Sequence, residues 1–334
     1  MKRIITIVSF LLVLLMIVPY HSAAVYYDSS SFISSQNINQ VLDAFFADYN
    51  STASYCIYSI QELYAVGNSN VHYVCVDAEV DSYPMYFIID SNSIIVEFAK
   101  SRSPFFSCSS EGKQLLYSPC QYFYKAKGDS EIFNLISNEQ INENTIIDAK
   151  LKNKSSDKNH SAGQQKYNYP SSDYIINVPD NNITSTYGDL NTSMYNILKY
   201  WDENGFNDLV SNEASARSSI ETCLNNNGGV YRIAFANAMD EYVGACNSNY
   251  IPASYCNFSP VFDDLRFEIT RYYSPCVLGI SLNYAHLTYN VTGVGYKIIS
   301  NVNYAIIHDC CSSTAYDIYL EFSHVEFLGG FSIF

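Results

Sequence analysis

Positively charged side chains are scarce in this chain of 334 residues, which has 18 Lys and Arg against 33 Asp and Glu. The resulting net charge of −15 argues against a nucleic-acid partner, because phosphate backbones are bound by clustered Lys and Arg. Such an acidic balance is typical of a solvated surface that keeps a protein soluble. The chain also lacks internal repeats and glycine-rich phosphate-binding motifs.

Long apolar runs are absent except at the N-terminus. There Lys2 and Arg3 precede the apolar run Ile4–Val18, and small residues follow at 22–24. A charged start, an apolar stretch and small residues form the pattern of a secretory signal peptide, here at residues 1–24. A membrane anchor is the alternative, but this run falls short of the roughly 20 residues that span a bilayer. We therefore expect a secreted, extracellular protein with no stable membrane span after signal cleavage.

Metal-binding spacings of cysteine are missing as well. The ten cysteines include no CxxC pair and no Cys/His cluster with zinc spacing, and His308 beside Cys310 and Cys311 is the only tight group. We expect no metal and no cofactor. Export favours disulfides, and four cysteines lie in the first half of the chain and six in the second. Even numbers on both sides predict disulfides closed within each half, with the pairing left open.

The hydrophobic patterning divides the chain into two folded units joined by a linker. Residues 25–136 predict one helix followed by strands, and residues 137–172 form a polar, weakly patterned linker. Residues 173–334 predict helices first and then an antiparallel sheet, which gives an α+β fold class. The helices are expected at 37–49, 193–206, 214–226, 234–243 and 261–272. The strands are expected at 55–66, 71–80, 85–89, 94–98, 276–282, 289–300, 304–309, 318–322 and 325–333, with two further short elements within 114–133.

The stretch 187–201, YGDLNTSMYNILKYW, predicts a loop that enters an amphipathic helix. Its residues Asn196–Trp201, together with Thr192, resemble the pattern that follows the nucleophilic cysteine in one family of papain-like cysteine peptidases. Such enzymes place the cysteine at the start of a helix, because the helix N-terminus and a histidine lower the thiol pKa. In this chain Asp189 stands at the cysteine position, and a carboxylate cannot do the work of a thiolate.

Two later segments resemble the same family, in the same order along the chain. The segment 290–297, NVTGVGYK, is similar to the strand that the catalytic histidine opens, and Tyr289 stands at the histidine position. His286 lies three residues earlier. The segment 304–311, YAIIHDCC, is similar to the strand whose aspartate orients that histidine, and Asp309 stands at the aspartate position.

The chain therefore resembles the secreted bacterial papain-like cysteine peptidases of the double-glycine, bacteriocin-processing type. The resemblance covers residues 173–334 and implies a papain-like fold, in which helices pack on an antiparallel sheet. Residues 25–136 resemble the smaller α+β prosegments of these proteins, notably at SIIVEFAKSRSPFF and QLLYSPCQYFYK. Because the nucleophile and histidine positions are both substituted, the resemblance implies a pseudopeptidase that binds a peptide or protein. A related active peptidase is one candidate partner.

These positions also allow other interpretations. Asp189 is expected to cap the helix, since aspartate accepts hydrogen bonds from the first helical N–H groups; an acid–base pair with Asp309 is the functional alternative. His286 would supply the missing histidine if a bulge shifted its strand. Cys223 or Cys276 could be proposed as a replacement nucleophile, although disulfide roles are favoured for both. Two alternative functions follow: an active hydrolase with a rearranged site, and a disulfide-stapled surface interaction protein.

Overall fold

The computed structural model describes the chain from residue 35 onward with several gaps. The described residues are 35–66, 68–128, 130–141, 168–181, 189–229, 234–281, 288–311 and 313–334. The expected signal peptide at 1–24, most of the expected linker, and His286 lie outside these ranges. Within them, no helix combines the length and the apolarity that a membrane crossing requires.

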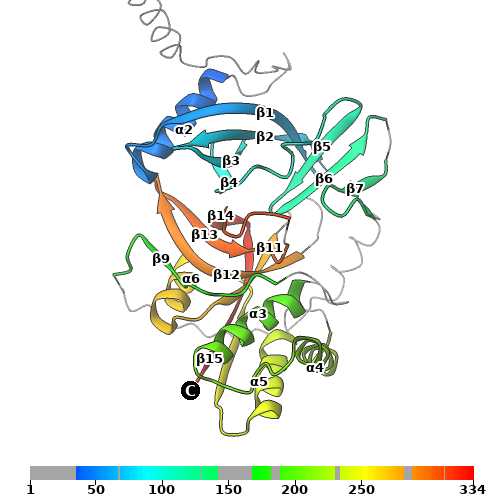
Figure 1. Ribbon diagram of the computed structural model, residues 1–334, viewed down its shortest axis with the longest axis vertical. Coiled ribbons are helices and arrows are strands. Elements are labelled where there is room, and N and C mark those ends of the chain that lie inside the picture. The colour runs from blue at the N-terminus through cyan, green and yellow to red at the C-terminus, as the bar shows by residue number, and fades with distance from the viewer. Residues whose placement is uncertain are drawn as a thin grey trace, which may run out of the picture.

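The described residues form a mixed α+β structure around one sheet of 15 strands (Figure 1). The sheet is mostly antiparallel and runs in the order β10-β15-β11-β12-β13-β14-β4-β3-β2-β1-β5-β6-β7-β8, with β9 beside β12. The first unit contributes α2 (Ser35–Tyr49), β1 (Tyr55–Ala65), β2 (Asn68–Val80), β3 (Tyr83–Asp90), β4 (Ile95–Ala99), β5 (Lys113–Ser118), β6 (Gln121–Ala126), β7 (Ile132–Asn134) and β8 (Gln140–Ile141).

The second unit contributes five strands after most of its helices, as the sequence predicts, together with β9 before the helices and β10 between α5 and α6, which the sequence did not predict. Its helices are α3 (Asp189–Glu203), α4 (Glu213–Asn226), α5 (Ala234–Cys246), α6 (Phe262–Phe267), the π-helix η3 (Glu268–Tyr272) and the short η4 (Phe322–His324). Its strands are β9 (Ser172–Tyr174), β10 (Pro252–Asn257), β11 (Cys276–Ser281), β12 (Thr288–Ile299), β13 (Val302–His308), β14 (Ile318–Glu321) and β15 (Val325–Ile333). In Figure 1 α3, α4 and α5 gather at one end of the molecule and the strands of the first unit at the other.

The two units meet through backbone pairing between β14 and β4. The strands are antiparallel, with Ile318 opposite Ala99 and Leu320 opposite Glu97. This pairing, which we call the seam, makes the sheet continuous from the first unit into the second. The boundary expected near residue 136 therefore separates two parts of the chain that share one sheet.

Apolar packing also crosses the seam. One core cluster joins first-unit residues such as Tyr86 and Tyr117 to second-unit residues such as Ile307 and Leu320. A second cluster packs α2 on β2, β3 and β4 and includes Tyr304 of β13. In α2 the buried side chains fall at helical spacing, which explains why this segment is an amphipathic helix: Ile38, Leu42, Phe45 and Phe46. The third large cluster holds α3, α4 and α5 against β11 and β15.

The structure differs from the sequence-based expectations in several places. Ser172, the last residue of the expected linker, begins β9, which pairs with Gly295–Lys297 of β12. Strand β8 inside the expected linker and strand β10 between the helices were not predicted. The helix expected over 261–272 ends in a π-helix at Glu268–Tyr272, which is closed by Tyr273 in the left-handed conformation with φ 50°. Pro84, expected to break a strand, lies inside β3 opposite Glu79, at a point beyond the pairing of β3 with β4, where the missing N–H costs no ladder bond.

Disulfides were expected within each half of the chain, and the structure instead has ten free cysteines, all of them in described residues. Several sulfurs are turned toward polar groups of the surrounding fold. The Cys276 sulfur lies 3.9 Å from the carbonyl oxygen of Gly293, and the Cys246 sulfur lies 3.9 Å from that of Leu209. Even cysteine counts indicate that bridges are possible, but they do not bring two sulfurs into bonding geometry.

If the seam joins the units into one cooperative structure, damage in the first unit must destabilise the second. Phe98 of β4 is fully buried, and its ring stacks on Tyr319 of β14 at 4.4 Å between centroids. Phe98→Ala should cost about 3–5 kcal/mol. Trp201 on α3 is the only tryptophan, so its fluorescence reports on the second unit. We expect the Trp201 unfolding transition to move to lower denaturant in this variant.

The matched control is Tyr83→Ala, an aromatic truncation at a side chain that is 70% exposed. It should change the unfolding free energy by no more than about 0.5 kcal/mol. A Trp201 transition that ignores Phe98→Ala, while a separate transition of the first unit shifts, would show that the two units unfold independently.

Candidate functional site

Helix α3 forms the base of the candidate site. It begins at Asp189, whose side chain lies outside the described part of the chain. Four fully buried apolar side chains at helical spacing hold the helix against the core: Leu190, Met194, Ile197 and Leu198. Four polar side chains on the same turns are also fully buried: Asn191, Thr192, Ser193 and Asn196. Buried polar groups need hydrogen-bond partners, so these four require an organised environment.

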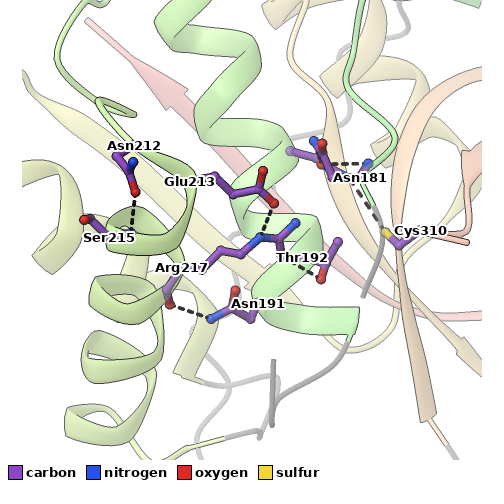
Figure 2. A network of polar contacts seen from close by, with 9 residues as sticks. Asn181, Asn191, Thr192, Asn212, Glu213, Ser215, Arg217 and Cys310 are labelled. Atoms are coloured by element: carbon purple, nitrogen blue, oxygen red, sulfur yellow. Dashed lines mark hydrogen bonds and ion pairs between the residues drawn. The ribbon is translucent and has the colours of Figure 1, made fainter. Parts of the chain in front are cut away.

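Arg217 of α4 supplies part of that environment (Figure 2). Its guanidinium donates to Thr192 Oγ1 at 3.0 Å and pairs with Glu213 at 2.9 Å. Its backbone carbonyl accepts a hydrogen bond from Asn191 Nδ2 at 2.9 Å, and its guanidinium lies over the ring of Tyr195 at 4.4 Å. Arg217 thus fixes the first turns of α3 against α4 while its own charge is paired.

Asn196 ties α3 to the opposite side of the site. Its Oδ1 accepts from both the backbone N–H and the Nδ2 of Asn181, at 3.3 and 2.8 Å. Its Nδ2 faces Thr292 Oγ1 on β12 at 3.4 Å and the sulfur of Cys310 at 3.7 Å. Ser193, one turn earlier, has its hydroxyl 3.9 Å from the same sulfur. A single buried amide therefore joins α3, the segment before it, β12 and the end of β13.

Tyr289 and Asp309 meet directly. Strands β12 and β13 are antiparallel with Thr292 opposite His308, which brings the beginning of β12 beside the end of β13. The Tyr289 hydroxyl donates to the backbone carbonyl of Asp309 at 2.6 Å. The resemblance places the histidine and its orienting aspartate at these two positions, and the fold brings them into contact. The Tyr289 side chain is used to hold the chain at Asp309.

The Asp309 carboxyl group is buried and turned inward. Its Oδ1 accepts hydrogen bonds from Thr314 Oγ1 at 2.6 Å and from the backbone N–H of Cys311 at 3.1 Å. Burial raises the pKa of Asp309 to about 8, although the Thr314 hydrogen bond opposes the shift, and the charge of Asp180 raises it further. At neutral pH this group is therefore largely protonated.

A second carboxyl group, that of the half-buried Asp180, lies near Asp309. Its Oδ1 accepts the backbone N–H of Cys310 at 3.2 Å, so the successive N–H groups of Cys310 and Cys311 bind two different carboxyl groups. Burial raises the pKa of Asp180 to about 6, and the charge of His308 lowers it. Cys310 itself has φ 63°, a left-handed conformation that is uncommon outside glycine and asparagine.

His308 belongs to the same group of polar side chains. Its Nε2 lies 3.2 Å from Asp317 Oδ1, its Nδ1 lies 3.3 Å from the carbonyl oxygen of Pro179, and the Tyr316 ring covers it at 4.3 Å. The imidazole is fully buried and has a partner at each nitrogen. Within the described ranges, no group of three or more His, Cys, Asp or Glu side chains is arranged to hold a metal ion.

The Cys310 thiol lies against Ser193 and Asn196 of α3, and its surroundings do not activate it. The side chain is buried, and burial raises its pKa well above the ordinary range. The charges of Asp180 and Asp309 raise this pKa further, because both disfavour a thiolate. Nucleophilic cysteines need the opposite surroundings, with positive charge and partial exposure.

The first unit also reaches this site. The charge of Glu97 on β4 contributes to the raised pKa of Asp309. The charge of Asp309 in turn contributes to the raised pKa of Cys120, at the tip of the β5–β6 hairpin. The Glu97 carboxyl group is fully buried and accepts hydrogen bonds from three tyrosine hydroxyls and one backbone N–H. Its donors are Tyr86 at 2.9 Å, Tyr122 at 2.6 Å, Tyr117 at 2.8 Å and Cys120 N at 2.9 Å.

The structure thus brings some of the predicted site residues together but does not describe all of them. Tyr289 and Asp309 are together, α3 begins at Asp189 and not at 193 as the helix pattern predicted, and His286 falls outside the described residues. Sequence reasoning missed Asp180 and Asn196. Asn196 had a detectable signal, because it is an amide one turn after Thr192 on the apolar side of an amphipathic helix. Asp180 had none, since it lies in a polar segment of no clear pattern.

Comparison of the chain with protein-family models found no match, and neither did comparison with curated proteins. The fold and the side-chain geometry therefore carry the functional argument.

The raised pKa of Asp309 makes a prediction for stability. An acid whose pKa is raised in the folded state contributes stability that is fully present below its unfolded value near 4 and is lost as the pH rises toward about 8. Asp309→Asn keeps an acceptor oxygen but cannot ionise. Between about pH 5 and about pH 9, the melting temperature of both proteins should fall. We expect the fall to be several degrees smaller for Asp309→Asn than for the unaltered protein.

Glu111→Gln, a change at an exposed carboxylate, is the control and should leave the pH profile unchanged. Asp180 and Glu268, whose pKa values burial raises to about 6 and about 7, remain in the Asp309→Asn variant, so a reduced slope and not a flat profile is expected. Parallel profiles for Asp309→Asn and the unaltered protein would show that Asp309 is already ionised in the folded state.

Proposed function

We propose that the chain is a secreted, catalytically inactive homologue of papain-like cysteine peptidases, and that it acts by binding a peptide or a protein. The observation that supports this proposal is the contact between two of the positions that the resemblance selects, Tyr289 and Asp309, beside the first turns of α3. Tyr289 touches Asp309, and the first turns of α3, which begin at Asp189, lie against Cys310 next to Asp309. A helix start facing two antiparallel strands is the arrangement that a papain-like site requires.

The chemistry at these positions supports inactivity. The helix begins with an aspartate where a thiol is needed, and the Tyr289 hydroxyl is hydrogen-bonded to a backbone carbonyl. Orienting a catalytic histidine needs a carboxylate anion, and burial raises the pKa of Asp309 to about 8. The neighbouring thiol of Cys310 is buried among acidic groups that disfavour its ionised form.

Binding is the role that remains for such a scaffold. The buried polar contacts of Arg217 and Asn196 hold α3 in a fixed relation to β12 and to the end of β13. Precise positioning of this kind suits a recognition surface as well as a catalytic one. The proposed ligand is a peptide or protein met outside the cell, with a related active peptidase as one candidate.

A mechanism-based probe for cysteine peptidases tests the proposal. The purified chain should show no labelling that a peptide aldehyde inhibitor competes away. Cys56 and Cys246 are exposed and can react non-specifically, so the same experiment on the Cys56→Ser, Cys246→Ser double variant separates background from site labelling. Competed labelling of the unaltered protein would establish an active thiol and refute the proposal.

The correspondence of positions can be tested by restoring the missing groups. Asp189→Cys combined with Tyr289→His would place a thiol at the helix start and an imidazole beside Asp309. Above about pH 8, where Asp309 ionises, we expect the double variant to gain competed probe labelling at residue 189, identified by peptide mass spectrometry, while each single variant stays unlabelled. Labelling of Asp189→Cys alone at the rate of an exposed thiol, unchanged by adding Tyr289→His, would show that these positions do not form one site.

A further inference from the structure

The first unit has the position of a removable prosegment in the resemblance, but its contacts are those of a permanent part of the fold. β4 and β14 are interior strands of the sheet, since β4 also pairs with β3 and β14 also pairs with β13. Removing the first unit would expose the hydrogen-bonding edge of β14. It would also uncover Ile318 and Leu320, both fully buried. An exposed, apolar strand edge is a strong liability for aggregation.

Side chains on both sides of the seam interlock. The Phe98 ring stacks on Tyr319 at 4.4 Å and meets Tyr304 edge-on at 5.3 Å between ring centroids. The Tyr304 hydroxyl donates to the carbonyl of Ile95 at 2.8 Å. These contacts are buried, and they have the composition of a domain core, not of the polar surface at which transient partners meet.

A second set of contacts joins α2 to the turn between β12 and β13. The Ser300 backbone N–H donates to the Asp48 carboxylate, and the Ser300 hydroxyl donates to the carbonyl of Ala44 at 3.2 Å. The Lys297 ammonium lies over the Tyr49 ring at 4.1 Å. The first unit is therefore attached at the seam and again at its N-terminal helix.

The attachment also reaches the candidate site. The hairpin between β5 and β6 turns at Cys120, which has φ 57° and a side chain only 4% exposed. The backbone N–H of Cys120 donates to Glu97 at 2.9 Å, and Glu97 lies on β4 directly opposite Leu320 of β14. The seam strand β4 thus positions the tip of the hairpin. Burial is the largest cause of the raised pKa of the Cys120 thiol, followed by the charge of Glu97 and then by that of Asp309.

We propose that the first unit is a permanent half of this protein, and that cutting the linker leaves a two-chain protein instead of releasing a mature second unit. The inference rests on the seam and the α2 contacts, so it holds whether or not the chain is a pseudopeptidase. It assigns Glu97 a positioning role, because this side chain connects the seam to the hairpin beside Asp309.

Controlled cleavage of the full chain tests the proposal. A recognition sequence for a specific protease is inserted within residues 150–158, and the purified protein is cut and passed over a sizing column at about 1 µM. At this concentration a complex needs roughly −8 kcal/mol to remain together. We expect both fragments to elute together with unchanged Trp201 emission, and with the same dependence of melting temperature on pH as the uncut protein. Elution of the second fragment alone with native Trp201 emission would overturn the proposal.

A variant at the seam makes the outcome quantitative. Tyr319→Ala removes the ring that stacks on Phe98 but no buried charge. In the uncut protein the linker keeps the units at high effective concentration, so the variant should stay folded. After cutting, its fragments should separate at lower urea and associate at least about tenfold more weakly than those of the parent protein.

Tyr83→Ala, whose side chain is 70% exposed, is the control and should behave like the parent after cutting. If Tyr319→Ala and Tyr83→Ala fragments separate at the same urea concentration as the parent, the seam does not hold the units together and the proposal fails. Neither result depends on probe labelling, so this test and the test of the proposed function fail separately.

Discussion

The pairing of β14 with β4 is the interaction on which the rest of the molecule depends. It sets Leu320 opposite Glu97 and so fixes two elements at once. On one side, β14 pairs with β13, whose end carries Asp309. On the other side, Glu97 ties β4 to the hairpin that ends at Cys120. A shift of one residue along this pair would turn every buried side chain of β14 to the opposite face, so the register is strongly specified.

Two buried acids near the seam show how the fold manages charge. Glu97 is fully buried and accepts four hydrogen bonds, three of them from tyrosine hydroxyls. Burial still raises its pKa, and these hydrogen bonds lower it. The Asp309 Oδ1 accepts from Thr314 and from one backbone N–H, and its pKa rises to about 8. Burying an ionised carboxylate is costly unless donors replace water, so burial raises the pKa of both acids and their hydrogen bonds oppose the shift.

Much of the fold could be predicted from local pattern, and the seam could not. Helical spacing of apolar residues places α2, α3, α4 and α5 within a few residues of their observed ends, because burial of one face repeats every 3.6 residues. β4 and β14 are apolar runs. Their composition does not reveal whether they pair within one unit or across the two units. Strand partners far apart in sequence leave no local signal, which is why the sheet appeared as two. Asp180 escaped for the same reason, since only tertiary contact brings it to Cys310.

The polar interior at α3 is better explained by positioning than by chemistry. A buried network costs stability unless its members are satisfied, and an apolar helix face would pack here without that cost. Asn196 instead links α3 to Asn181, Thr292 and Cys310 through one side chain. Hydrogen bonds are directional where apolar contacts are not, so this amide sets one rotation of α3 relative to β12. The proposed recognition role would use this geometry, since Asp189 at the start of the helix supplies no thiol to position.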